Sequence, residues 1–263
     1  MTVYAPMLGT IWRVLDSYGI DPCEVIPAEL YRPGRKSTSS GRVGFADYDA
    51  IQAHAASLIR DSSMGLRSAS LLLPSHLGAL GHAWLASSSL RTALKRAARF
   101  VRMFHEHIEF NLDESQVGIT ATYKMLRQPT RPGLVGDGQI AGLLQLCRFN
   151  YGDSLVPVEV MLKRPKPPDP GPWAAFFGTA VKFGQPVNGL SISNEDADRP
   201  LTGSDPEMIA LHEEVIQRYL MRQDRANILN RTRLQIMEEL PTGAVTEDGT
   251  ARALNMSKRN LNR

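Results

Sequence analysis

The chain has 263 residues, 43% hydrophobic and 22% charged, a composition typical of folded globular proteins and unlike that of disordered chains. Its formal net charge of +3 permits a polyanionic partner but does not require one. Two distant cysteines, Cys23 and Cys147, do not make a disulfide framework or a cysteine-rich zinc site, so we expect a reducing compartment.

Two helical patterns lie in the first 60 residues. Apolar residues recur at helical spacing over residues 6–18, with Arg13 and Asp16 among them. These charges interrupt the apolar run that a secretory signal needs, and no stretch of about 18 residues is apolar enough to span a bilayer. We therefore expect a cytoplasmic protein with no membrane partner. The segment 31–44, rich in glycine and serine, is expected to be a loop, and 46–60 a second helix.

Further helices are expected up to residue 104. A short helix can follow Ser63, and small residues after His76 indicate a helix that packs closely on its neighbours. Ser88 or Ser89 can cap the next helix. The apolar side chains of that helix form one stripe, as in helices that cover a core: Leu90, Ala93, Leu94, Ala97, Val101 and Phe104.

The pattern changes from helical to alternating after residue 107. Alternating apolar residues over 108–112 and 117–123, separated by the turn sequence "DES", predict a β-hairpin. A continuous apolar segment at 137–151 predicts a buried helix. Three more strands are expected, at 156–162, 180–183 and 187–192. Residues 1–200 are thus expected to form an α+β domain of mixed helices and antiparallel sheet.

The remaining chain is expected to be helical. A linker over 201–226 contains a helix at 205–222, which could also contribute to the interface of a homodimer. A partial, all-α domain is expected over 227–263, beginning with a helix at 227–240.

The last twenty residues have the spacing of a helix-turn-helix. Ala251 is small where two helices would cross, and Asn255 tolerates the left-handed backbone of the turn. The second helix would present side chains that suit phosphate contacts and base-edge hydrogen bonds: Ser257, Lys258, Arg259, Asn260, Asn262 and Arg263. The alternative is a stand-alone small-molecule-binding or dimerisation module, in which the terminal helices only pack or pair and bind no DNA.

Three stretches resemble one family. "LPTGAVTEDGTARALNMSKRNLNR" resembles the first helix-turn-helix of AraC-type transcription regulators, whose core runs A…L-x-M-S-x-R-x-L-x-R. "HLGALGHAWLASSSLRTALKRAARF" and "FFGTAVKFGQPVNGLSIS" are similar to the N-terminal sensor domain of an arabinose-binding-like subgroup. The resemblance implies an effector-sensing, dimerising domain followed by a DNA-binding domain, and it transfers no inducer.

The end of the chain departs from the family pattern. These regulators carry two helix-turn-helix units, and this chain stops within the recognition helix of the first. Affinity for DNA scales with the number of phosphates that a protein neutralises. We therefore expect a form that is truncated within its DNA-binding domain and weak in DNA binding.

The effector is expected to bind between the hairpin and the helices. The candidate pocket residues are Arg99, Phe104, His105, Tyr123 and Phe149. The alternative for each aromatic residue is a place in the ordinary hydrophobic core.

Competing chemistry has little support. His105 and His107 flank Glu106, but their spacing does not match a metal-ligand pair on one helical face. The nucleophile motifs G-x-S-x-G and S-x-x-K and the nucleotide motif G-x-G-x-x-G are absent from the sequence. We therefore expect no enzyme activity, no metal and no cofactor.

Overall fold

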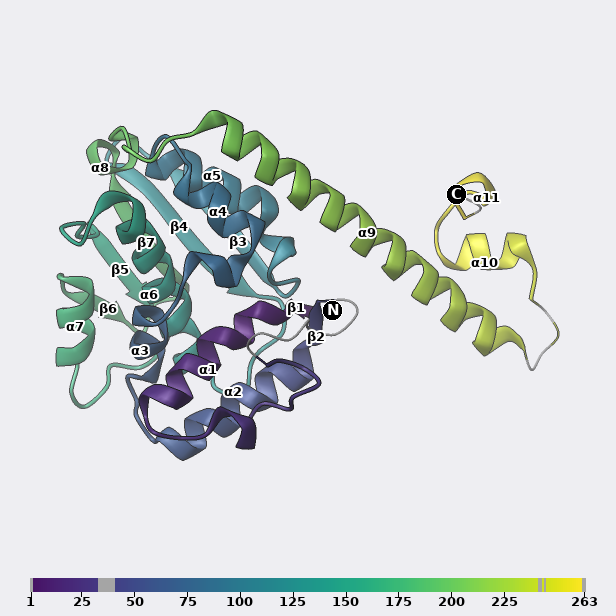
Figure 1. Ribbon diagram of the computed structural model, residues 1–263, viewed down its shortest axis with the longest axis horizontal. Coiled ribbons are helices and arrows are strands. Elements are labelled where there is room, and N and C mark those ends of the chain that lie inside the picture. The colour runs from purple at the N-terminus through teal and green to yellow at the C-terminus, as the bar shows by residue number, and fades with distance from the viewer. Residues whose placement is uncertain (1, 33–40, 241–242, 244, 262–263) are drawn as a thin grey trace. The chain divides into compact units, whose positions relative to one another are not determined.

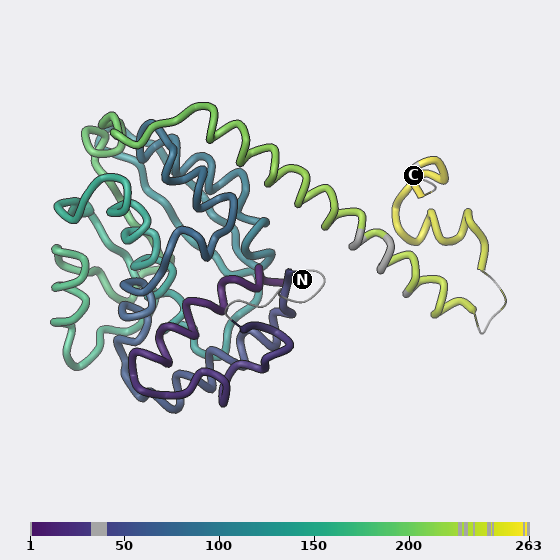
Figure 2. The backbone as a smooth tube through the Cα atoms, viewed as in Figure 1, coloured from purple at the N-terminus to yellow at the C-terminus, as the bar shows by residue number. Residues whose placement is uncertain are grey.

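The computed structural model describes residues 2–32, 41–240, 243 and 245–261. Contacts divide the chain into two compact units, Met1–Ile216 and Gln217–Arg263, each described by itself below. Figure 1 labels the helices and strands, and Figure 2 traces the backbone in the same view. Helices and a mixed sheet together confirm the predicted α+β fold class.

A five-stranded sheet forms the centre of the first unit, in the order β3-β4-β7-β5-β6. Its strands are β3 (Ile108–Glu114), β4 (Gly118–Met125), β5 (Glu159–Leu162), β6 (Val181–Phe183) and β7 (Asn188–Ser193). One face is buried, with Ile119 and Leu190 on it. The other face is polar, and the hydroxyls of Thr120 and Ser191 lie 2.8 Å apart on it. This alternation is typical of antiparallel sheets that are covered on one side.

The predicted hairpin is confirmed, and it pairs in an antiparallel register. Phe110 of β3 lies opposite Tyr123 of β4, with their ring centroids 4.7 Å apart. The two strands predicted after residue 180 are also present, but they are not neighbours. β5 lies between them, antiparallel to β7 and parallel to β6.

Six helices between residues 64 and 198 pack on the sheet or on one another: α3 (Met64–Ser70), α4 (Ala79–Leu85), α5 (Leu90–Phe100), α6 (Pro132–Tyr151), α7 (Gly171–Phe177) and α8 (Asn194–Asp198). Figure 1 shows α4 and α5 beside the β3–β4 hairpin. The predicted cap of α5 is Ser89, whose hydroxyl accepts a hydrogen bond from the Thr92 N–H at 3.2 Å. A single helix from His76 was expected, but a 3₁₀ helix over Pro74–Leu77 ends before Gly78, whose φ of +59° favours glycine, and α4 starts after it.

A second core lies at the N-terminal side of this unit. The strands β1 (Thr2–Tyr4) and β2 (Arg42–Gly44) pair antiparallel, and α1 (Leu8–Ser17) and α2 (Phe45–Ile59) pack beside them. The expected loop at 31–44 therefore ends in a strand, because Val43 pairs with Val3 and both side chains are buried. Residues 33–40 of that loop lie outside the described residues.

One helix, α9 (Pro206–Glu239), replaces the two helices predicted at 205–222 and 227–240. No glycine or proline interrupts it, so the backbone hydrogen bonds continue through the expected break. Its apolar residues were expected to face inward. Ile216 is buried, but Met208, Leu211 and Val215 are exposed.

Candidate functional site

A cavity of about 150 Å³ lies in the first unit, where its two hydrophobic cores meet. Met7 and Met125 pack against both cores and also line the cavity. Helices α1, α2, α3 and α6 contribute walls, as do residues of the hairpin and of the segment before it. A cavity of this volume accommodates a molecule about the size of benzene.

The walls are mostly apolar. Leu72, Leu77 and Leu143 line the cavity, together with Trp84. The indole N–H of Trp84 donates to the Leu146 carbonyl at 2.8 Å, so this ring brings no unsatisfied donor to the wall. Such a surface favours an apolar ligand body.

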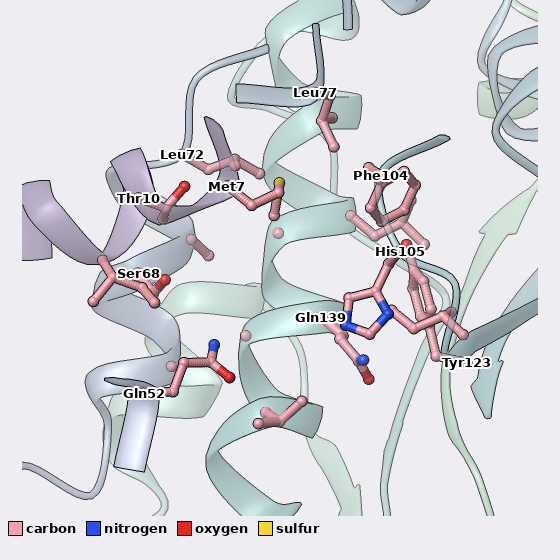
Figure 3. A pocket seen from close by; sticks show the side chains of 18 of the residues that line it. Met7, Thr10, Gln52, Ser68, Leu72, Leu77, Phe104, His105, Tyr123 and Gln139 are labelled. Atoms are coloured by element: carbon pink, nitrogen blue, oxygen red, sulfur yellow. The ribbon is translucent and has the colours of Figure 1, made fainter. Parts of the chain in front are cut away.

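A small set of polar side chains interrupts the apolar walls: Thr10, Tyr48, Gln52, Ser68, His105, Tyr123 and Gln139. Figure 3 shows Thr10, Gln52 and Ser68 to one side and His105 and Tyr123 to the other, with Gln139 between them. Within the part of the chain that the structure describes, the lining contains no Asp, Glu, Lys or Arg.

His105 is a neutral polar group in this wall. Its Nδ1 accepts a hydrogen bond from the backbone N–H of His107 at 3.2 Å, which leaves the ring hydrogen on Nε2. Burial, with smaller effects from His107 and Arg42, lowers the pKa of His105 to about 3. The imidazole therefore carries no charge near neutral pH.

The two tyrosines in the wall are also uncharged. Burial raises the pKa of both Tyr48 and Tyr123 above the ordinary value of a phenol. Both hydroxyls therefore keep their protons, and each offers a donor and an acceptor.

Gln139 has an unused acceptor. Its amide nitrogen donates to the Met125 sulfur at 3.0 Å. Its amide oxygen is buried and has no hydrogen-bond partner among the described residues. Buried polar atoms are ordinarily satisfied, so this oxygen marks a place where a ligand donor fits.

Three of the five predicted pocket residues, Phe104, His105 and Tyr123, line the cavity. Arg99 and Phe149 are not among its lining residues. The Arg99 guanidinium lies over the Phe100 ring and 3.5 Å from a carboxylate oxygen of Glu213, and Phe149 is 42% exposed. A ligand role of all five stays a prediction.

Sequence reasoning missed most of the polar wall. Gln139 is an amide side chain on the largely buried helix α6, next to Gly138 and near Gly142. This combination of a polar side chain and small neighbours in a core helix was the available signal. The sequence contains no comparable signal for Gln52 and Thr10, because only the packing of α1 and α2 brings these residues to the cavity.

The described residues include no group of three or more His, Cys, Asp or Glu side chains that could hold a metal ion. His76 lies 2.8 Å from the Thr10 hydroxyl through Nδ1, and the rings of His105 and His107 pack on Phe45.

The second unit contains the predicted pair of short helices, α10 (Glu247–Ala253) and α11 (Lys258–Leu261). Thr246 caps α10 by accepting the Gly249 N–H at 3.0 Å. Asn255 has a φ of +54°, as expected for the turn, and the Met256 N–H donates to the Ala251 carbonyl at 2.8 Å. Ala251 and its neighbour Thr250 are both buried, which fits a close crossing of the two helices.

The predicted DNA-contacting residues lie on or after this turn. Ser257, Lys258 and Arg259 are exposed. The Lys258 ammonium lies 2.7 Å from a carboxylate oxygen of Asp248, whose hydrogen bond raises the pKa of this lysine. Asn260 is in α11, with its side chain not described, and Asn262 and Arg263 lie outside the described residues.

Residues 19–201 match the family described as the arabinose-binding domain of AraC transcription regulator, N-terminal. The match covers more than half of the chain. The chain belongs to this family. The cavity lies within this AraC-type domain, except for the part of its wall that Met7 and α1 supply.

Two regulators from Pseudomonas aeruginosa are similar to this AraC-type chain, one in sequence and one in fold. An ornithine utilization regulator is 28% identical over 251 residues, which cover 94% of this chain and 73% of that protein. The crystal structure of the transcriptional regulator CdpR superposes with a TM-score of 0.58 at 15% identity, covering 96% of this chain and 77% of that one. The second likeness confirms the fold.

The family and both relatives are transcription regulators and not enzymes. Within the described ranges, no helix has the length and apolar character that crossing a membrane requires.

Proposed function

We propose that this AraC-type chain is a ligand-responsive DNA-binding regulator whose first unit senses a small molecule. The observation that carries the proposal is the cavity between the two cores, which has apolar walls and a few polar groups. A ligand there would contact both cores at once and favour one arrangement of them. The cytoplasm is the proposed compartment, since the DNA target is there.

In this proposal, α10 and α11 are a helix-turn-helix that contacts DNA. Ser257, Lys258 and Arg259 would bind phosphates or base edges, together with Asn260, Asn262 and Arg263. One such unit neutralises few phosphates, so we propose that this helix-turn-helix by itself binds DNA weakly, with a shallow loss of affinity as the salt concentration rises.

The test is fluorescence anisotropy with promoter DNA over a series of salt concentrations. Lys258→Ala or Arg259→Ala should weaken binding and reduce the salt slope by about one for each phosphate that the variant no longer neutralises. Lys124→Ala removes an exposed lysine of the first unit and is the matched control. Equal affinity of all three variants and the unaltered chain would contradict the DNA-contact assignment.

The alternative function is a stand-alone ligand-binding or dimerisation module. It predicts ligand-induced thermal stabilisation without any salt-dependent binding of DNA. A thermal-shift screen of amino acids, fatty acids and sugars, run beside the anisotropy experiment, separates the two functions. Amino acids are included because one relative is named for ornithine utilization.

We also propose a homodimer. Met208, Leu211 and Val215 are exposed at positions three and four residues apart on α9, so they share one face of the helix. Exposed apolar side chains on one helical face are typical of helix pairing.

A further inference from the structure

We infer that the effector is an uncharged molecule of about benzene's size with an N–H or O–H group that donates to Gln139. This inference rests on the proposed sensing function and adds the chemical class of the ligand. It is carried by the composition of the cavity wall and by the unused amide oxygen inside it.

The wall offers no counter-ion. Its ionisable side chains are His105, Tyr48 and Tyr123, and all three are neutral near pH 7, as described above. A charged ligand would lose its hydration on entry and gain no opposite charge among the lining side chains, which strongly disfavours binding. A zwitterionic diamino acid such as ornithine fits this wall poorly.

The polar end of the ligand has a specific partner. The Gln139 amide nitrogen is used by the Met125 sulfur, which fixes the direction of the amide group. The amide oxygen then accepts from a ligand donor. Around it, the walls of Leu72, Leu143 and Phe104 take an apolar ring or chain.

Four probes of nearly equal size separate charge from shape. Benzamide is neutral and has an N–H donor, acetophenone is neutral and has none, benzoate is an anion and benzamidinium is a cation. Isothermal titration calorimetry of the 263-residue chain at pH 7 should show benzamide binding roughly tenfold or more tightly than either ion. Acetophenone should bind more weakly than benzamide, by about threefold to tenfold.

The ionic probes can overturn the inference. If benzoate or benzamidinium binds as tightly as benzamide, the ligand class is wrong, while small-molecule sensing stands. The benzoate measurement also tests whether the amino-terminal part of α6, where Leu134 and Val135 line the cavity, receives an anion. If no probe binds but a charged metabolite stabilises the chain in the thermal-shift screen, the inferred ligand class is again wrong, while small-molecule sensing stands. If nothing binds and promoter DNA is not bound either, the proposed function itself fails.

Variants at Gln139 test the position of the donor. Gln139→Leu should remove the preference for benzamide over acetophenone. Gln139→Glu should shift the preference from benzamide toward benzamidinium by roughly tenfold, because a carboxylate supplies the missing counter-ion. Gln145→Glu is the matched control, on the same helix but outside the cavity wall. An unchanged preference in both Gln139 variants, with the fold intact by circular dichroism, would overturn the assignment.

Discussion

Arg96 on α5 donates through Nε to the carboxylate of Glu213 on α9 at 2.7 Å. Both side chains are largely buried, with 12% and 23% exposed, and Arg96 also donates to the Ser87 hydroxyl at 2.6 Å. This ion pair joins the first turns of α9 to α5. Burial makes it more costly to break than an exposed pair.

Arg96→Ala should therefore lower the free energy of unfolding by about 2 kcal/mol, because Glu213 stays partly buried without its main partner. Urea denaturation measures the change, and hydrogen exchange should show less protection in the first turns of α9. Lys124→Ala breaks the exposed pair with Glu109 and should cost less than about 1 kcal/mol. Equal losses in the two variants would contradict the structural role of Arg96.

Gly81 permits the close contact between α4 and the turn before it. A Cβ atom at this position would lie 1.8 Å from the Pro74 carbonyl oxygen, so backbone must move to admit it. Gly81→Ala should cost about 3 kcal/mol in the free energy of unfolding. At Gly142 the nearest atom is a Leu72 methyl at 3.5 Å, and Gly142→Ala should be neutral or stabilising by up to about 1 kcal/mol through helix propensity. Thermal denaturation of both variants measures these changes in stability. Similar losses of stability in the two variants would be evidence against the close contact at Gly81.

Some features could be predicted from local sequence because local sequence determines them. The hairpin of β3 and β4 follows from alternation on both sides of a polar turn, and Asn255 was expected at a left-handed backbone that it does adopt. The continuity of α9 was also readable, because its expected break contains no glycine or proline. Treating 205–222 and 227–240 as separate helices was wrong.

The cavity could be predicted only in part. Phe104, His105 and Tyr123 are close in sequence to the hairpin, which was the expected site. Gln52 and Gln139 are 87 residues apart and come together through the packing of α2 and α6 around a common space. Periodicity within one segment carries no information on such pairing. The parallel pairing of β5 with β6 could not be predicted for the same reason.

The buried Asp137 should give stability a specific pH dependence. Burial raises its pKa to about 6, against the opposing effect of its ion-pair partner Arg164. Between about pH 4 and pH 6 the native state then holds a proton that the unfolded chain has released. The contribution of Asp137 to the free energy of unfolding therefore decreases by about 3 kcal/mol as the pH rises through that range.

Asp137→Asn isolates that contribution. The native pKa of His76 is lowered to about 4, mainly by burial, and that of His105 to about 3. Both act in the opposite direction, since the unfolded chain gains their protons as pH falls below about 6.5. Urea denaturation gives the free energy of unfolding of the unaltered chain and of Asp137→Asn at each pH. The value for the unaltered chain minus the value for the variant should decrease as the pH rises from 4 to 7. A flat difference would show that Asp137 titrates normally.

The exposed apolar face of α9 gives the last prediction. Leu211 is 50% exposed between Met208 and Val215, and a second copy of the chain would cover all three in the proposed homodimer. Leu211→Glu would put a carboxylate into that contact, where its desolvation is not repaid. Sedimentation velocity at micromolar concentration should show a dimer for the unaltered chain and at least roughly tenfold weaker association for the variant. Leu58→Glu changes a comparably exposed leucine on α2 and should leave association unchanged. A monomeric unaltered chain would contradict the proposed homodimer. Equal weakening by both substitutions would contradict an interface on this face of α9, because such an interface contains Leu211 and not Leu58.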